Sequence, residues 1–168
     1  PFTREILIER EDFADPPPPK FFRLFPGQTV RLRAAGFVTC TGVDRDPATG
    51  AVTGLRGTCD PPSAERKVKA TIHWVSATEG VPAEIRQYDR LFKVEQPDAD
   101  KDVDFKTHLN PGSVEVLRGV VEPSLLHAVP GSRFQFERLG YYCADARHTR
   151  HGAPVFNLTV SLKDSKGK

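Results

Sequence analysis

The sequence lacks methionine altogether and holds one tryptophan and three cysteines in 168 residues. Because the chain starts at Pro1 without an initiator methionine, we expect it to be a piece of a longer polypeptide. No apolar run approaches the ~20 residues that a membrane helix needs, so we expect no membrane partner. Cys40, Cys59 and Cys143 are odd in number and far apart, which favours reduced thiols in a cytoplasmic protein.

Motifs for metal binding and catalysis are missing as well. The three cysteines and five histidines never show the C-x₂₋₄-C spacing of a structural zinc site, and residues 147–151 are more typical of a basic loop. The sequence has no G-x-S-x-G nucleophile elbow and no G-x-x-x-x-G-K phosphate loop. We therefore predict no catalytic residue, no metal site and no cofactor within this segment.

What the chain has in quantity is β-branched residues, with 16 valines and four isoleucines against twelve leucines. Apolar and polar residues alternate in short runs, most clearly over residues 67–75, and turn signals such as Pro26-Gly27 separate them. Residues 97–110 hold the one predicted helix, and no fixed-period repeat is visible. This pattern predicts an all-β fold of barrels or a sandwich, with strands over residues 5–9, 29–33, 36–41, 52–58, 67–75, 83–88, 90–94, 113–122, 133–139, 141–143 and 155–162.

Charge is distributed unevenly although the net charge is only +2. Residues 20–69 hold nine basic and four acidic residues, residues 79–105 hold four and eight, and residues 133–168 hold seven and three. Two basic segments therefore flank an acidic one. If the fold brings the basic segments together, their surface suits a polyanion; otherwise the charges are scattered over a solvated surface.

Arginines among aromatic residues are the strongest chemical signal. Residues 20–25 (KFFRLF) and 133–138 (RFQFER) interleave cations and rings, and Arg31 and Arg33 share one face of a predicted strand. Such groups read single-stranded RNA, because rings stack on splayed bases while amides and guanidinium groups bind base edges. A glutamine amide can match the N3–H and O4 of uracil. The alternative is that the phenylalanines are core residues and the arginines only line the edge of the sheet.

Seven segments resemble the glutaminyl-tRNA synthetase family, in order and along nearly the whole chain. They are residues 4–13, 30–33, 67–75, 84–92, 122–125, 134–143 and 154–157, and they include the runs KVKATIHWV, FQFERLGYYC and PVFN. The resemblance points to the C-terminal anticodon-binding region of that family. That region folds as two small β-barrels of ribosomal-protein-like topology, with few short helices.

The resemblance implies that an outer barrel is inserted into an inner one. We expect the distal, outer barrel at residues 20–92 and the proximal, inner barrel at residues 1–19 and 93–168. The family's catalytic domain lies upstream, and its HIGH-like and KMSKS-like motifs do not occur here. The whole protein is thus expected to be a monomeric ligase that joins glutamine to tRNA(Gln). It uses ATP with magnesium in the missing domain, while this segment is non-catalytic.

Five residues match the family's anticodon-reading positions. Arg31 and Arg33 match arginines that contact the first anticodon base and its backbone, and Gln135 matches the glutamine that reads the central uracil. Arg23 and Arg138 match arginines around the third base. The chain departs from the family pattern at three nearby positions, where polar residues are common: Phe22, Ala34 and Leu158.

The placement of Gln135 and Arg138 raises a geometric requirement. In an unbroken strand these two side chains point to opposite faces, because the strand period is two residues. The strand must therefore end or bulge near Glu137 if both residues contact one anticodon.

Three alternatives stay open from the sequence. The first is the anticodon-binding region of an archaeal or eukaryotic-type glutamyl-tRNA synthetase, whose C-terminal barrels are related and whose substrate would be glutamate. A non-enzymatic RNA-binding barrel, like the ribosomal protein of the same topology, is a second alternative. A structural β module without an RNA role is the third.

Overall fold

The computed structural model describes residues 2–162, which form two compact units. Unit 1 spans Pro1–Thr78 and unit 2 spans Glu79–Lys168. Strands dominate both units, and helical structure is limited to three short 3₁₀ turns within the described part of the chain. The expected all-β class with few short helices is therefore confirmed. None of the helical turns that the structure describes is long and apolar enough to cross a membrane.

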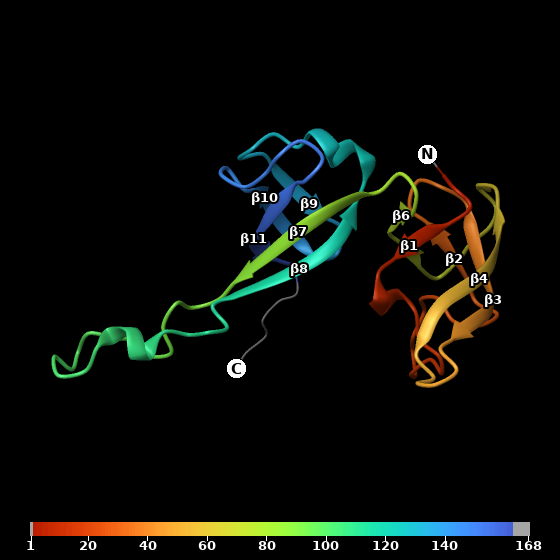
Figure 1. Ribbon diagram of the computed structural model, residues 1–168. Coiled ribbons are helices and arrows are strands. Elements are labelled where there is room, and N and C mark those ends of the chain that lie inside the picture. Colours follow the sequence, from red (N-terminus) through yellow and green to blue (C-terminus); the bar gives the residue numbers. More distant parts are fainter. Residues whose placement is uncertain (1, 163–168) are drawn as a thin grey trace. The chain divides into compact units, whose positions relative to one another are not determined.

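Unit 1 contains two sheets (Figure 1). The larger has the order β4-β3-β2-β5, in which β2 pairs antiparallel with β3 and parallel with β5, and the smaller joins β1 and β6 in antiparallel register. The elements are β1 (Ile6–Ile8), the 3₁₀ turn η1 (Arg10–Asp12), β2 (Thr29–Leu32), β3 (Phe37–Arg45), β4 (Val52–Asp60), β5 (Thr71–Ile72) and β6 (Trp74–Ser76).

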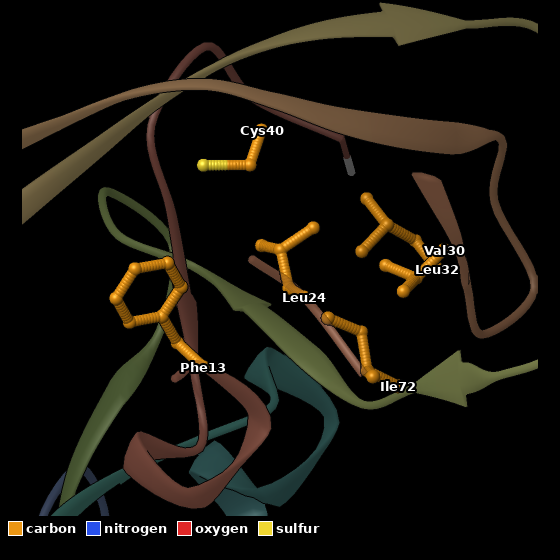
Figure 2. Packing of buried hydrophobic residues seen from close by; sticks show 6 residues of the cluster. All are labelled: Phe13, Leu24, Val30, Leu32, Cys40 and Ile72. Atoms are coloured by element: carbon orange, nitrogen blue, oxygen red, sulfur yellow. The ribbon is translucent and has the colours of Figure 1, made fainter. Parts of the chain in front are cut away.

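The core of unit 1 lies between these strands and the chain that precedes β2. Figure 2 shows its six most buried members converging on one another: Phe13, Leu24, Val30, Leu32, Cys40 and Ile72. The alternation in β2 explains this packing, since two of its four residues face inward and are completely buried. All three cysteines are free thiols, and burial raises the pKa of Cys40.

Unit 2 contains one five-stranded sheet with the order β8-β7-β11-β10-β9. All neighbours pair antiparallel except β7 and β11, which run parallel. Beyond the end of the β7–β8 hairpin, residues 89–113 extend as an arm (Figure 1). The elements are β7 (Val81–Tyr88), the 3₁₀ turn η2 (Phe105–His108), β8 (Val114–Val121), the 3₁₀ turn η3 (Pro123–His127), β9 (Arg133–Phe136), β10 (Gly140–Ala144) and β11 (Val155–Ser161).

Aromatic rings fill the core of unit 2. Phe136 stacks on Tyr142 with ring centroids 4.3 Å apart, and Phe134 and Phe136 both pack edge-on against Phe156. Because the side chains of a strand alternate, these two phenylalanines leave the residues between and beside them on the outer face of β9.

Several sequence expectations differ from the structure. The run 67–75, expected as one strand, is split: β5 pairs with β2 while β6 pairs with β1, so the chain passes from one sheet to the other at His73. The expected helix at 97–110 is reduced to η2. The sheets are open, since β8 and β9 in unit 2, and β4 and β5 in unit 1, pair on one side only within residues 2–162.

The division into units also differs from the expected one of 20–92 against 1–19 and 93–168. Residues 1–19 group with the rest of unit 1, because β1 pairs with β6. The chain from 81 to 88 groups with unit 2, because β7 pairs with both β8 and β11. The two units therefore follow each other along the chain rather than being nested.

Each unit contains the same hairpin, which was not visible as a repeat in the sequence. In unit 1 it runs from Pro26-Gly27 through β2 to Gly36 and β3, and in unit 2 from Pro130-Gly131 through β9 to Gly140 and β10. The backbone hydrogen bonds match pairwise. Gly27 N–H donates to the carbonyl of Cys40 at 2.8 Å, and the N–H of Gly131 donates to the carbonyl of Ala144 at 2.8 Å.

The three-residue turns of the two hairpins match as well. The N–H of Ala35 donates to the carbonyl of Leu32 at 3.0 Å, and the N–H of Leu139 donates to that of Phe136 at 3.0 Å. The middle residue of each turn has a positive φ, 53° at Ala34 and 63° at Arg138. When the two hairpins are matched by sequence position and hydrogen bonding, Arg31 and Gln135 occupy equivalent outward-facing positions.

Candidate nucleic-acid interface

Arg31 lies on the outer face of β2, between the buried Val30 and Leu32. Its guanidinium carbon is 5.0 Å from the ring centroid of Phe37, the residue opposite it on β3. A cation over an aromatic face at this distance is attracted by the ring and loses some of its rotational freedom. The side chain is therefore exposed and held in place, as a phosphate-binding or base-binding arginine requires.

Arg66 is a second cation at the same ring, which sequence reasoning missed. Its guanidinium carbon also lies 5.0 Å from the Phe37 centroid, its side chain forms an ion pair with Asp60, and a weaker hydrogen bond joins it to Thr29 Oγ1 at 3.4 Å. The backbone carbonyl of Arg66 accepts a hydrogen bond from Arg31 Nη2 at 3.4 Å. Arg66 lies in a loop without a periodic pattern, so only its long-range contacts identify it.

Arg33 is placed just beyond the end of β2, in the turn, rather than on one strand face with Arg31. Its backbone is fixed by two bonds to β5 and β6: its N–H donates to the carbonyl of Ile72 at 3.0 Å, and its carbonyl accepts from Trp74 Nε1 at 2.9 Å. The side chain is exposed. The turn thus displays Arg33 next to Arg31 at one end of the hairpin.

Arg23 has a structural partner. Its Nη1 lies 3.3 Å from Oδ1 of Asp12, whose side chain is completely buried, and it also donates to the carbonyl of Glu11 at 3.1 Å. A buried carboxylate needs such a cation, because an unpaired charge in the interior is costly. Arg23 is still partly exposed, so RNA contact is compatible with this role.

Gln135 occupies the centre of β9 and is exposed on its outer face. The flanking Phe134 and Phe136 turn inward to the aromatic core. Within residues 2–162, no protein group forms a hydrogen bond with the side-chain amide of Gln135. Its donor and acceptor are therefore directed to solvent or to a ligand, and a role in satisfying a buried backbone group is not observed.

The strand ends before Arg138, as the geometric requirement demanded. β9 stops at Phe136, and residues 137–139 form the turn in which Arg138 has φ 63°. A positive φ at a non-glycine residue is uncommon and costs about 1 kcal/mol or more. Because the two-residue alternation stops here, Arg138 is not confined to the face opposite Gln135.

Asp145 organises the loop between β10 and β11. Its carboxylate accepts hydrogen bonds from Asn157 Nδ2 at 2.8 Å and from the backbone N–H groups of Arg147 and His148, and His148 Nδ1 lies 2.9 Å away. These hydrogen bonds lower the pKa of Asp145 far below its usual range, and the bond from Asn157 contributes most. Burial acts in the opposite direction and raises the pKa. Arg86 adds an ion pair at 3.6 Å. The basic loop expected at 147–151 is thus an ordered one.

Two groups of candidate residues result, one on each hairpin. Arg31 and Arg66 share the Phe37 ring in unit 1, with Arg33 in the turn that follows β2, whereas Gln135 and the turn residue Arg138 belong to the matching hairpin of unit 2. The first group is cationic and suits phosphate oxygens and guanine edges, whereas the second offers an amide and one cation. Among the residues that the structure describes, no group of three potential metal ligands is found.

Comparison with known proteins agrees with this arrangement. The family model described as class I (E and Q) tRNA synthetase anticodon-binding domain matches residues 1–60, and a second model of the same description matches residues 71–145. The two matches fall largely within unit 1 and unit 2, respectively.

Among similar curated proteins are the glutamine–tRNA ligases of Xanthomonas campestris pv. campestris (strain 8004), Xanthomonas axonopodis pv. citri (strain 306) and Ralstonia pickettii (strain 12J). They are 49%, 50% and 49% identical to the chain over 175 residues. The alignments cover 100% of the chain and 30% of each relative, so the chain spans less than a third of their length. The two family-model matches and the relatives at about half identity show that the chain belongs to the family of class I (E and Q) tRNA synthetase anticodon-binding domains.

Proposed function

We propose that the chain reads the anticodon of tRNA(Gln) as part of a monomeric, cytoplasmic glutamine–tRNA ligase. Glutamine is joined to the tRNA with ATP and magnesium in a domain outside this chain. In this proposal Gln135 reads the central uracil, Arg31 and Arg33 contact the first base and its backbone, and Arg23 and Arg138 lie around the third base.

The observation that carries the proposal is the open amide of Gln135. It lies exposed between two buried phenylalanines, so the residue is held in place by the core while its donor and acceptor stay available. A carboxamide offers the donor and acceptor pair that uracil needs. The exposed Arg31, which lies over the Phe37 ring in the matched hairpin, supplies a positioned cation for the neighbouring nucleotide.

The glutamate alternative is weakened by the similar proteins, which carry the name glutamine–tRNA ligase at about half identity. The ribosomal-protein alternative is weakened by their length, since the relatives extend far beyond the part that this chain matches. The three free cysteines support a reducing, cytoplasmic setting.

Aminoacylation by the ligase that carries this chain tests the proposal directly. We expect charging of tRNA(Gln) with labelled glutamine and none with labelled glutamate. A tRNA(Gln) transcript altered at the central anticodon base should be charged with a much lower kcat/KM. Charging with glutamate, or equal use of both transcripts, would overturn the proposed function.

A further inference from the structure

Tyr141 lies directly opposite Gln135 on the neighbouring strand β10. Residues directly opposite each other in an antiparallel pair carry side chains on the same face, with Cβ atoms roughly 4.5–5.5 Å apart. Tyr141 is 45% exposed, whereas the next residue, Tyr142, faces the core and is buried. An open phenol ring and an open amide thus lie side by side on the outer face of unit 2.

The equivalent position in the other hairpin is used differently. Phe37 pairs with Arg31 in β2 and β3 as Tyr141 pairs with Gln135, but Phe37 is 1% exposed and carries the guanidinium groups of both Arg31 and Arg66. The ring of unit 1 therefore serves as a support for cations. No guanidinium group of the described residues covers the ring of Tyr141 in unit 2, so the face of this ring remains available to a planar ligand.

The backbone at Tyr141 is specifically shaped. The register between β10 and β11 shifts between Tyr141 and Tyr142, and the hydroxyl of Thr159 donates to the carbonyl of Tyr141 at 2.8 Å. At the preceding residue, a Cβ on Gly140 would lie 2.5 Å from the carbonyl oxygen of Val160. A bulge of this kind changes the direction of the neighbouring side chain and is common beside binding sites.

We propose that Tyr141 is the stacking half of a base-binding site of which Gln135 is the edge-reading half. The ligand is one splayed pyrimidine of a single-stranded RNA loop, whose face stacks on the phenol ring while its edge bonds to the amide. This inference rests on the proposed function and adds a residue to it. Arg133 lies two residues before Gln135 on the same exposed face and provides a cation beside the site.

A stacking role is consistent with the chemistry of the two side chains. An amide alone reads the base edge but leaves both faces of the base in water, and stacking on an aromatic ring supplies most of the sequence-tolerant affinity for an unpaired base. The ring contributes no charge, so its effect on binding should be independent of salt.

The test measures binding of the 168-residue chain to an RNA hairpin that carries the glutamine anticodon loop. Tyr141→Ala should weaken binding about 5- to 100-fold, whereas Tyr141→Phe should stay within about twofold of the original. Tyr88→Ala is the matched control, because Tyr88 is an exposed tyrosine of the same sheet (57%) on β7. It should leave binding unchanged, and the melting temperature of each variant reports folding.

An RNA with an abasic central position makes the test specific to one base. If Tyr141 stacks on that base, the abasic RNA and Tyr141→Ala should each weaken binding, and combining them should add little further loss. Fully additive losses, or an equal loss with Tyr88→Ala, would overturn the inference. If Gln135→Ala weakens binding and Tyr141→Ala does not, the inference fails while the proposed function stands. If the chain binds the RNA and neither Gln135→Ala nor Tyr141→Ala weakens binding, the proposed function fails together with the inference.

Discussion

Arg31 and Gln135 stand at the same position of two hairpins with the same hydrogen-bond pattern, yet their surroundings differ. Arg31 lies over a buried ring that it shares with Arg66, whereas Gln135 lies beside an exposed ring. A single backbone frame therefore presents a charged group in one unit and a neutral hydrogen-bonding group in the other. The first suits a contact that depends on charge, and the second suits a contact that depends on base identity.

Replacing Gln135 tests the second kind of contact. Under the proposed function, Gln135→Ala in the full-length protein should lower kcat/KM for tRNA(Gln) by about 1–3 kcal/mol in transition-state terms, the usual value of one good base contact. The ratio of kcat/KM for tRNA(Gln) to kcat/KM for a transcript altered at the central base should decrease. A lower melting temperature together with unchanged central-base discrimination would instead assign Gln135 a purely structural role.

Replacing Arg31 tests the contact that depends on charge. If its contact is mainly to phosphate, Arg31→Ala should weaken binding of the correct and the central-base-altered RNA by similar factors. Arg56→Ala provides the control, because Arg56 is an exposed arginine of unit 1 on β4 whose partner is Asp44. A loss confined to one of the two RNAs would contradict a phosphate contact.

Both sites depend on the hairpin that the two units share. Each hairpin has one glycine after its turn, and neither glycine has space for a side chain. A Cβ on Gly36 would lie 2.0 Å from the carbonyl oxygen of Asp60, and one on Gly140 would lie 2.5 Å from that of Val160. Both obstacles are backbone atoms of a neighbouring strand, so the strands must move to accommodate a methyl group.

Alanine at either glycine should therefore destabilise its unit, by about 1–3 kcal/mol, the usual cost of overpacking, or more. Gly119→Ala in β8 is the control, since its nearest atom would be Ile85 Cγ1 at 4.0 Å. Urea unfolding of the three variants measures the difference. Equal stability of Gly36→Ala, Gly140→Ala and Gly119→Ala would show that the close approach is unimportant.

Much of this element was predictable, and the reasons for the remainder are physical. Alternation in FQFER predicted that Phe134 and Phe136 share one face and Gln135 the other, but it left open whether the rings stack on RNA or lie in the core, and the structure puts them in the core. The repeat was hidden because only Pro, Gly and the apolar positions match, while Arg31 and Gln135 differ. The break at His73 was unpredictable, since strand alternation does not reveal which sheet each half joins. Arg66 escaped because its relation to Phe37 depends on tertiary contact.

The loop between β10 and β11 predicts a dependence of stability on pH. Hydrogen bonds from Asn157 and from the backbone of 147–148 lower the pKa of Asp145, so the folded value lies below that of the unfolded chain. The stabilisation is therefore fully present above the ordinary Asp pKa of about 3.9 and is lost as the pH falls below it. Melting temperatures measured between about pH 6 and pH 3 should fall for the wild type.

Asp145→Asn should show a smaller fall over the same range and a lower starting melting temperature, because the amide accepts these bonds less well than a carboxylate. Asp98→Asn in the arm serves as the control and should follow the wild type, since Asp98 is exposed. Identical acid sensitivity of the Asp145 variant and the wild type would show that this carboxylate does not govern the response.

At the scale of the whole molecule, the chain is nearly neutral but its cations are concentrated where the candidate residues lie. The net charge is +2, whereas residues 20–69 alone hold nine basic and four acidic residues. An RNA that binds through this segment must release counterions, and one phosphate contact to a single strand changes the slope of log K against log salt by about −0.7.

The 168-residue chain should therefore bind tRNA(Gln) weakly and with a steep salt dependence, because it spans less than a third of the length of its relatives and, under the proposed function, the rest of the tRNA is bound outside it. Arg31→Ala should reduce the magnitude of the salt slope by about 0.7, since it removes one phosphate contact to a single strand. Gln135→Ala should weaken binding without changing the slope, because the side chain is uncharged. Titrations at three or more salt concentrations separate the two effects. A binding constant that does not change between low and moderate salt would exclude a phosphate-led interface, and equal slopes for the wild type and Arg31→Ala would remove Arg31 from it.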